Sequence, residues 1–565
     1  MTEYERWLKE PLDDQDLTEE LLAVKDQPEE INDRFYCNLD FGTAGLRGVI
    51  GAGTNRMNVY IVRKATQGLA DYLNAHVRNA NVAIAYDSRI KSDVFAKETA
   101  AVLAANGIHA HIYPWLSPVP TLSFATRYLK CDAGVCVTAS HNPAKYNGYK
   151  VYGSDGCQIT SEMAKEVSDA IAKTDVFEGV KRMSFEDGVK EGRISYIKDE
   201  VINAFLQEVL NQSVIPEPCK GLKVVYTPLN GSGRVCVTRI LDMIGVDDVT
   251  VVPEQEMPDG HFTTCPFPNP EVKEALQKGL ELSEKVQADL LVATDPDCDR
   301  CGIAVNQNGE YVLMSGNEVG VLLLDFIAQA RIKNGKMPKD PVAVTTIVST
   351  DMADAVAKSY GIEMRRVLTG FKYIGDQIAS LEAAGHPERY IFGFEESYGY
   401  LAGSYVRDKD AVVGSMLICE MAAYYRSIGS SIKEELERIY AEYGRYLNKV
   451  NSYEFPGLSG METMAGIMTK LRENPPAEFA GYKVVTVADY KARTKTDVAT
   501  GKTEPIELPA ANVLIYTLAG GASVVVRPSG TEPKIKTYFT TLGKDLAEAE
   551  AQQKALAAAV EPLLK

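Results

Sequence analysis

The first segment that could do chemistry ends an apolar run and reads Val137-Thr-Ala-Ser-His-Asn-Pro143. It presents Ser140 at a predicted strand end, with His141 beside it and Lys150 ten positions later. Serine, asparagine and proline are also common turn residues, so the segment alone could be an ordinary strand-to-turn junction. Neither a Ser-His-Asp hydrolase pattern nor a G-x-S-x-G elbow accompanies it. The serine could instead accept a phosphoryl group, with Lys150 handling the proton.

Three carboxylates stand at alternate positions of a second segment: Asp295, Asp297 and Asp299. Such a group can converge on one hard cation, because Mg²⁺ and Ca²⁺ take oxygen ligands. An EF-hand is excluded, since its sixth position would be Arg300 rather than glycine and its twelfth Asn306 rather than glutamate. A solvated acidic turn is the alternative. Apolar residues flank the segment at 290–293 and 302–305, and three like charges between core strands repel one another unless a cation is bound.

A third segment, Gly393–Gly399, carries Glu395, Glu396 and Ser397 after a predicted strand. Paired carboxylates and a hydroxyl suit a polyol, because sugar hydroxyls both donate and accept hydrogen bonds. Arg407 and Lys409 follow and add positive charge.

The fourth segment reads Arg527-Pro-Ser-Gly-Thr-Glu-Pro-Lys534. Arginine offers a fork to phosphate oxygens, Ser529 and Thr531 offer hydroxyls, and Gly530 lets backbone N–H groups approach an anion. The segment is a candidate phosphate cradle, and a plain hairpin turn from Val526 to Ile535 is the alternative.

Alternating strands and amphipathic helices must position these four segments, and this rhythm predicts mixed or parallel sheets flanked by helices. The predicted strands are 81–86, 108–113, 133–138, 221–227, 290–294, 342–349 and 389–393. The predicted helices are 93–106, 235–244, 351–360 and 546–564, with a helical extension over the first forty residues.

The chain has 565 residues, too many for one hydrophobic core, so we expect three or four domains. We place their boundaries near residues 210, 325 and 450. The resulting predicted domains are an N-terminal extension with the serine segment (1–210), a metal-binding domain (211–325), a sugar-binding domain (326–450) and a phosphate-binding domain (451–565).

The net charge of −17 argues against a nucleic-acid or anionic-membrane partner, since both need a basic surface. The N-terminus does not read as a signal peptide, and no apolar stretch approaches the roughly 18 residues of a membrane span. The one C-x-x-C, Cys298 to Cys301, has no second pair near it, so reduced thiols are expected rather than zinc or redox chemistry. These features predict a cytoplasmic location.

The four segments, in this order and spacing, resemble the signature loops of the α-D-phosphohexomutase superfamily, which contains phosphoglucomutases and phosphomannomutases. The match covers nearly the whole chain. The stretch Phe41-Gly-Thr-Ala-Gly-Leu-Arg-Gly48 looks like the longer phosphoglucomutase type, which also includes phosphopentomutases. The resemblance implies an α/β fold with four domains around a central cleft: three related α/β domains with mixed sheets and a smaller C-terminal α+β domain.

The resemblance also implies roles for residues. Ser140 bears the phosphoryl group, and Arg47, His141 and Lys150 complete the catalytic set, with Lys150 a candidate general acid/base. Asp295, Asp297 and Asp299 bind Mg²⁺ together with the phosphate on Ser140. The implied substrate contacts are Arg300, Thr369, Gly370, Lys372, Glu395, Ser397, Arg407, Lys409, Arg527, Ser529, Gly530 and Thr531.

The implied reaction interconverts glucose 1-phosphate and glucose 6-phosphate. Glucose 1,6-bisphosphate is the intermediate and also the activator. The sugar segment ends Ser397-Tyr-Gly-Tyr400 and lacks the G-H ending of the dual glucose/mannose type, which favours glucose. Phosphopentomutase and phosphomannomutase remain alternatives of the same fold. A haloacid-dehalogenase-type phosphatase would leave three segments unexplained, and a non-catalytic sugar-phosphate sensor is expected to have lost the serine or a carboxylate. The sequence does not indicate an oligomeric state.

Overall fold

The computed structural model describes residues 2–215, 217, 219–455, 460–529 and 534–565. The chain divides into two compact units that interleave along the sequence. The first unit runs to Gly316 and adds Ile374–Phe392 and Ser397–Ile428. The second unit holds Asn317–Tyr373, Gly393–Glu396 and Gly429–Lys565.

Three helices begin the chain, α1 (Glu3–Lys9), α2 (Gln15–Ala23) and α3 (Pro28–Phe35), which confirms the predicted helical extension. Trp7 of α1 is fully buried and packs edge-to-face on Tyr60 and Phe177, with ring centroids 5.6 and 5.3 Å away. Aromatic rings prefer this geometry and bury a large apolar area. The extension is therefore fixed to the first α/β layer by an aromatic core.

The first sheet is mixed and has the strand order β1-β5-β4-β2-β3-β6. Its strands are β1 (Leu46–Val49), β2 (Asn81–Tyr86), β3 (His109–Ile112), β4 (Ala133–Val137), β5 (Tyr146–Gly153) and β6 (Ile194–Tyr196). The associated helices are α4 (Val59–His76), α5 (Ser92–Ala105), α6 (Val119–Tyr128), α7 (Ser161–Lys173), α8 (Phe185–Lys190) and α9 (Asp199–Leu210). Strand β4 is buried along its whole length, as its continuous apolar run predicts, and it delivers Ser140 at its carboxyl end.

The second sheet is also mixed, in the order β11-β10-β9-β7-β8. Its strands are β7 (Lys223–Thr227), β8 (Asp248–Val251), β9 (Leu290–Thr294), β10 (Cys301–Gln307) and β11 (Glu310–Met314). Its helices are α10 (Arg234–Met243), α11 (Pro253–Glu256) and α12 (Gln277–Val286). Strands β9 and β10 pair antiparallel from Thr294 opposite Cys301, so the carboxylate segment is the turn of a buried hairpin.

The third sheet has the order β13-β12-β14-β15, with β12 (Val342–Thr346), β13 (Glu363–Val367), β14 (Tyr390–Glu395) and β15 (Gly399–Leu401). Its helices are α13 (Gly316–Lys333), α14 (Met352–Ser359), α15 (Phe371–Ala383), α16 (Ala411–Ser427) and α17 (Ile432–Tyr443), with a short 3₁₀ turn η1 (Pro387–Arg389). The strand predicted over 342–349 ends at Thr346, because the chain turns there and the hydroxyls of Thr346 and Ser349 lie 2.9 Å apart.

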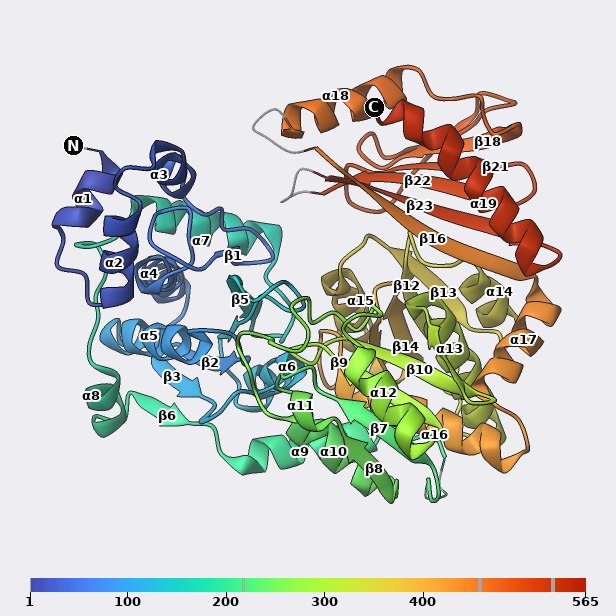
Figure 1. The fold of residues 1–565 in the computed structure, drawn as a ribbon, viewed down its shortest axis with the longest axis horizontal. Helices are drawn as coiled ribbons and strands as arrows, with labels where there is room; N and C mark the ends of the chain where they lie inside the picture. Colours follow the sequence, from blue (N-terminus) through green and yellow to red (C-terminus); the bar gives the residue numbers. More distant parts are fainter. Residues whose placement is uncertain (1, 216, 218, 456–459, 530–533) are drawn as a thin grey trace. The chain divides into compact units, whose positions relative to one another are not determined.

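The C-terminal sheet pairs antiparallel in the order β16-β23-β22-β21-β18-β19-β20, and β17 pairs with β18. Its strands are β16 (Arg445–Glu454), β17 (Glu478–Phe479), β18 (Tyr482–Asp489), β19 (Thr494–Asp497), β20 (Thr503–Pro505), β21 (Leu514–Leu518), β22 (Ser523–Pro528) and β23 (Lys534–Gly543). Helix α18 is Gly460–Glu473, and α19 (Leu546–Val560) lies along β23 and β16 in Figure 1.

The helix predicted over 546–564 ends earlier, at Val560, and continues as a 3₁₀ turn, η2 (Glu561–Leu563). Pro562 accounts for the difference, since a proline lacks the N–H that continues a helix and its ring clashes with the preceding turn. The α/β fold class with a separate C-terminal sheet domain is confirmed. None of the helices in the described ranges is long and apolar enough to cross a membrane.

Gly320→Ala should lower the stability of the second unit by about 1–3 kcal/mol, because a β-carbon there would meet the Phe394 ring at 2.3 Å in a packed core. Gly466→Ala is the matched control. It lies in exposed helix α18 with nothing within 4 Å, so alanine should stabilise by roughly 1 kcal/mol. Differential scanning calorimetry of both variants checks this, and a Gly320→Ala protein as stable as wild type would contradict it.

Candidate active site

Ser140 lies in the turn after β4 with a backbone φ of +53°. A left-handed backbone is costly for a residue with a β-carbon and persists where the surroundings enforce it, often at functional sites. Its side chain is 4 % exposed, and its Oγ donates to Asp295 Oδ2 at 2.9 Å. His141 Nδ1 lies 3.1 Å from the same Oγ. The serine singled out in the sequence therefore contacts the first of the three carboxylates.

Arg89, in the loop after β2, holds this turn by its backbone. Its guanidinium donates to the carbonyl oxygens of Ser140, Asn142, Pro143 and Tyr146. Asp87 Oδ2 lies 3.3 Å from Arg89 Nε and accepts a hydrogen bond from Thr138 Oγ1 at 2.6 Å. A buried ion pair needs additional hydrogen bonds to offset desolvation, and here those bonds also fix the serine turn.

Asp295, Asp297 and Asp299 form a buried group whose carboxylate oxygens lie within 4.8 Å of one another. In the part of the chain that the structure describes, Asp297 Oδ1 and Asp299 Oδ1 accept no hydrogen bond. Burial and its two neighbours raise the pKa of Asp295 well above its ordinary value, and burial and Asp297 raise that of Asp299. A divalent cation would neutralise this charge and supply a partner for both orphan oxygens, so the group fits a hard metal ion.

The carboxylate turn is held by hydrogen bonds within it and by the neighbouring turn before α10. Asp295 Oδ1 accepts the backbone N–H groups of Asp299 and Arg300, both at 3.0 Å. Ser232 donates to Pro296 O through its N–H at 2.8 Å and its hydroxyl at 2.9 Å. The neighbouring Gly231 has no room for a side chain, because a β-carbon would meet Pro296 Cα at 2.4 Å. The Asn-Gly-Ser-Gly turn before α10 thus supports the candidate metal loop.

Two lysines balance part of the negative charge. Lys150 Nζ, on β5, lies 2.8 Å from Asp297 Oδ2 and 3.6 Å from Asp299 Oδ2. Burial opposes the charge of Lys150, but the two carboxylates outweigh it and raise the lysine pKa above its ordinary value. Lys150 therefore keeps its proton in this arrangement. Lys409 Nζ lies 3.1 Å from Asp299 Oδ2 and 3.0 Å from Asp408 Oδ1, and Tyr152 donates to the other oxygen of Asp408.

His141 is held neutral beside the serine. Burial and the charges of Arg300 and Arg47 lower its pKa well below the ordinary value. Arg300 pairs with Glu271 at 2.9 Å, and Arg47 is exposed on β1 opposite Gly148 of β5. The Ser140 hydroxyl donates its one proton to Asp295 in this arrangement, and a rotation of that hydroxyl would direct the proton at the neutral imidazole 3.1 Å away, so His141 is a candidate base for Ser140.

Arg407 is engaged away from these groups. Its guanidinium donates to Glu382 and to the carbonyls of Ser404 and Val406. It anchors the segment that carries Lys409, and its predicted contact with substrate stays a prediction.

In the second unit, two predicted sugar segments meet, since Glu395 Oε1 accepts the N–H of Gly370 at 2.8 Å. Thr369 Oγ1 beside it is buried and has no hydrogen-bond partner among the described residues, so a substrate hydroxyl could satisfy it. Burial and Glu395 raise the pKa of Glu396 to about 7. Glu396 Oε2 lies 3.2 and 3.3 Å from the hydroxyls of Thr346 and Ser349.

Of the predicted phosphate segment, the structure describes Arg527, Pro528, Ser529 and Lys534. Arg527 Nη1 donates to Tyr538 OH at 3.4 Å, and its charge acts on Glu396, so it lies near the sugar segment of the same unit. Lys372 Nζ lies 4.9 Å from the Tyr373 ring centroid. Gly530 and Thr531 fall outside the described residues, and Ser397 begins the last segment of the first unit.

The sequence reasoning missed Asp87, Arg89 and Asp408. The first two follow strand β2 directly, in the same strand-then-polar-loop pattern that marked the four predicted segments. That pattern could have flagged them. Asp408 is one of four consecutive charged residues, Arg407 to Asp410, and the sequence does not distinguish it from the others. Its hydrogen bond from Tyr152 depends on the tertiary fold.

Four family models of the phosphoglucomutase/phosphomannomutase type match the chain: alpha/beta/alpha domains I, II and III at residues 38–177, 202–309 and 315–443, and the C-terminal domain at 470–559. A Staphylococcus epidermidis protein named phosphoglucomutase is 38 % identical over 517 residues, 91 % of this chain and 92 % of its own.

Solved structures share the fold. A phosphoglucomutase/phosphomannomutase family protein from Burkholderia thailandensis has a TM-score of 0.67 at 18 % identity and covers 93 % of this chain and 97 % of its own. Parafusin, a phosphoglucomutase from Paramecium, has a TM-score of 0.67 at 16 % identity, and the match covers 94 % of this chain and 95 % of parafusin.

Millimolar Mg²⁺ should raise the melting temperature of the protein, because it relieves the repulsion among three buried carboxylates. Asp297→Asn should abolish most of that shift. Glu310→Gln, an equal charge change at an exposed site of the same sheet, should keep it. Thermal denaturation with Mg²⁺ or with excess chelator measures the effect, and an unchanged shift in Asp297→Asn would rule out this group as the metal site.

Proposed function

The chain belongs to the phosphoglucomutase/phosphomannomutase family, and on that premise we propose that it interconverts glucose 1-phosphate and glucose 6-phosphate through a phosphoserine at Ser140. The observation that carries the proposal is the hydrogen bond of 2.9 Å from Ser140 Oγ to Asp295 in the carboxylate group. This contact puts a potential phosphoryl acceptor against a candidate cation site.

The reaction balances as two transfers. In the first, the bond between phosphorus and Ser140 oxygen breaks while a bond from phosphorus to the free hydroxyl of the hexose monophosphate forms, which gives glucose 1,6-bisphosphate; the sugar hydroxyl loses its proton and the released Ser140 oxygen gains one. In the second transfer, the bond between the other phosphate and its sugar oxygen breaks while a bond from that phosphorus to Ser140 Oγ forms; Ser140 loses its proton and the released sugar oxygen gains one. Positioning and charge neutralisation do most of the catalytic work in such reactions.

We propose that residues of the first unit supply these functions. His141 is neutral and placed to take the Ser140 proton when the serine is phosphorylated. Lys150 and Lys409 carry positive charge at the carboxylates and would also stabilise phosphoryl oxygens. Arg89 donates to the backbone carbonyl of Ser140 and so supports the turn that carries the proposed acceptor hydroxyl. Arg47 and Arg300 add positive charge nearby.

We propose that Asp295, Asp297 and Asp299 hold Mg²⁺ together with a phosphate oxygen on Ser140. When bound, the ion withdraws charge from the phosphoryl group. Mg²⁺ is favoured because the donors are all carboxylate oxygens and a phosphate completes the set.

We propose that Glu395, Thr369, Gly370, Lys372 and Ser397 contact the sugar hydroxyls of the substrate. Arg527, Ser529, Gly530 and Thr531 would hold the phosphate that is not being transferred. A cradle that accepts either phosphate is required because the intermediate binds in two orientations.

We also expect a cytoplasmic enzyme whose partner is a small sugar phosphate. Ten cysteines without a disulfide support a reducing compartment, and the net charge of −17 supports the absence of nucleic-acid and membrane partners.

Ser140→Ala should reduce mutase turnover by about 10⁴-fold or more, because the acceptor oxygen is lost. Intact-mass analysis of wild type should find a fraction with one added phosphate at Ser140, and the variant should have none there. Ser161→Ala, an exposed serine at the start of α7, should keep wild-type kcat. Near-normal kcat in Ser140→Ala would disprove the mechanism and would favour a binding-only sensor.

The kcat/KM for glucose 1-phosphate should be about tenfold higher than for mannose 1-phosphate or ribose 1-phosphate. A tenfold difference corresponds to about 1.4 kcal/mol, roughly the free energy of one hydrogen bond. Glu395→Gln should shrink that preference together with the rate, because it weakens an acceptor that reads hydroxyl positions. A substrate panel with catalytic glucose 1,6-bisphosphate checks both. If ribose 1-phosphate is the best substrate, the chain is a phosphopentomutase, and if mannose 1-phosphate is, a phosphomannomutase.

A further inference from the structure

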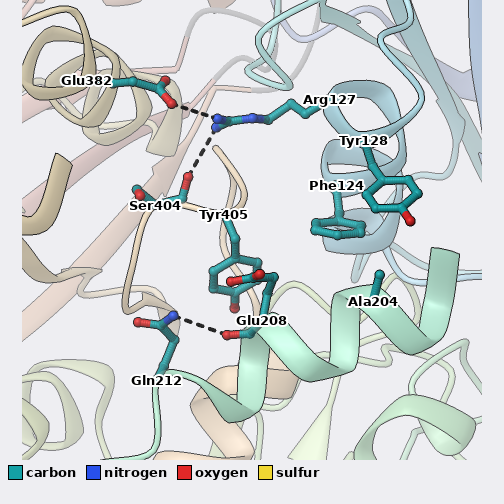
Figure 2. A pocket seen from close by; sticks show the side chains of 9 residues that line it. All are labelled: Phe124, Arg127, Tyr128, Ala204, Glu208, Gln212, Glu382, Ser404 and Tyr405. Atoms are coloured by element: carbon teal, nitrogen blue, oxygen red, sulfur yellow. Dashed lines mark hydrogen bonds and ion pairs between the residues drawn. The ribbon is translucent and has the colours of Figure 1, made fainter. Parts of the chain in front are cut away.

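A cavity of about 450 Å³ lies in the first unit between α6, α9, α15 and the segment after β15. Figure 2 shows Arg127 reaching across its upper side to Glu382 and Ser404, with Phe124 and Tyr128 on one wall and Tyr405 near the centre. None of its lining residues belongs to the site described above. The segment after β15, however, is the one that delivers Lys409.

The charge of the cavity favours a cation. Glu208 lines it half-buried, and no lysine or arginine in the described ranges forms an ion pair with its carboxylate, which accepts only a weak bond of 3.3 Å from Asn211. The positive charge of Arg127 is already engaged, by Glu382 at 2.9 Å and by the carbonyl of Ser404 at 3.1 Å. The carboxylate of Glu208 therefore has no positively charged partner among the described residues.

Two helix ends and an aromatic wall add to this preference. Arg127 and Tyr128 are in the last turn of α6, and Glu208 is in the last turn of α9, so the C-terminal turns of two helices, which carry partial negative charge, line the cavity. The Phe124 and Tyr128 rings are stacked with centroids 5.4 Å apart, and the small side chain of Ala204 opposite leaves room beside them. Aromatic faces attract cations and pack against flat hydrocarbon groups.

The cavity is connected to the active site through one short segment. Ser404 accepts from Arg127, and Tyr405 donates at 2.6 Å to Asp410, the residue that caps the start of α16. Arg407 is paired with Glu382, on the cavity wall. Between these anchors the chain carries Lys409 to 3.1 Å from Asp299. A ligand that pulls on Ser404, Tyr405 or Glu382 acts on the same segment.

We propose that this cavity binds a small organic ammonium ion, with the ammonium group at Glu208 and the hydrocarbon body against Phe124 and Tyr128, and that its occupancy is coupled to the carboxylate site through residues 404–409. Because coupling is reciprocal, a ligand in the cavity changes cation affinity at the carboxylates by the same factor that the cation changes ligand affinity. The proposal does not depend on which sugar phosphate the enzyme uses.

Isothermal titration calorimetry with tyramine and tyrosol tests the binding. The two probes share the aromatic body and differ only in an ammonium or a hydroxyl at the end. Tyramine should bind wild type with a millimolar or lower Kd, and tyrosol at least tenfold more weakly. Glu208→Gln should weaken tyramine by about tenfold, whereas Glu200→Gln, an exposed change on the same helix, should leave it unaltered. Equal binding of the two probes, undiminished binding to Glu208→Gln, or no tyramine binding would overturn the site.

A Mn²⁺ titration followed by electron paramagnetic resonance tests the coupling without any need for turnover. Saturating tyramine should change the Mn²⁺ Kd of wild type by about twofold or more and leave that of Glu208→Gln unchanged. Tyramine binding with an unaltered Mn²⁺ Kd would overturn the link to residues 404–409.

Discussion

Three carboxylates held within 4.8 Å of one another, out of contact with water, are the constraint around which the first unit is arranged. Their mutual repulsion has to be met by positive charge on every side. Lys150 comes from a β-strand of the first sheet and Lys409 from the segment before α16, and each must cross buried space to arrive. Balancing the negative charge therefore requires that the carboxylate loop, Lys150 and Lys409 meet at one point. A metal ion would complete this charge balance, since Asp297 Oδ1 and Asp299 Oδ1 have no hydrogen-bond partner in the described structure.

The serine turn satisfies the same constraint from the other side. Ser140 gives Asp295 a hydrogen bond, and the left-handed backbone that aims its hydroxyl is held by Arg89. Arg89 is itself buried, so it needs Asp87, which in turn fixes Thr138 at the end of β4. A chain of paired charges and hydrogen bonds therefore runs from the loop after β2 to the acceptor oxygen. In a buried network each member depends on the others being satisfied, so these contacts together hold the serine turn.

The sequence predicts the fold class and the chemistry-bearing loops well, because both have local signatures. Strands 81–86 and 290–294 appear where their apolar runs place them, and the serine, the three carboxylates and the two lysines come together. Two element ends were misplaced although their causes are local: the strand after 342 stops at Thr346, where a turn pairs the hydroxyls of Thr346 and Ser349, and the last helix stops before Pro562. The roles of Asp87, Arg89 and Asp408 could not be predicted, because they depend on contacts with distant residues. The ion pair of Arg407 with Glu382 was likewise not predictable from the sequence, and the substrate contact expected of Arg407 stays a prediction.

The hydrogen bonds from Arg89 to the serine turn determine which substitutions the turn can accept. All four of its acceptors in that turn are main-chain carbonyls, which every amino acid possesses. A substitution at Pro143 or Tyr146 would leave these acceptors in place, whereas no side chain other than arginine presents so many donors in a fixed plane. The side chain that fixes the backbone of the serine turn therefore comes from a residue fifty-one positions before Ser140.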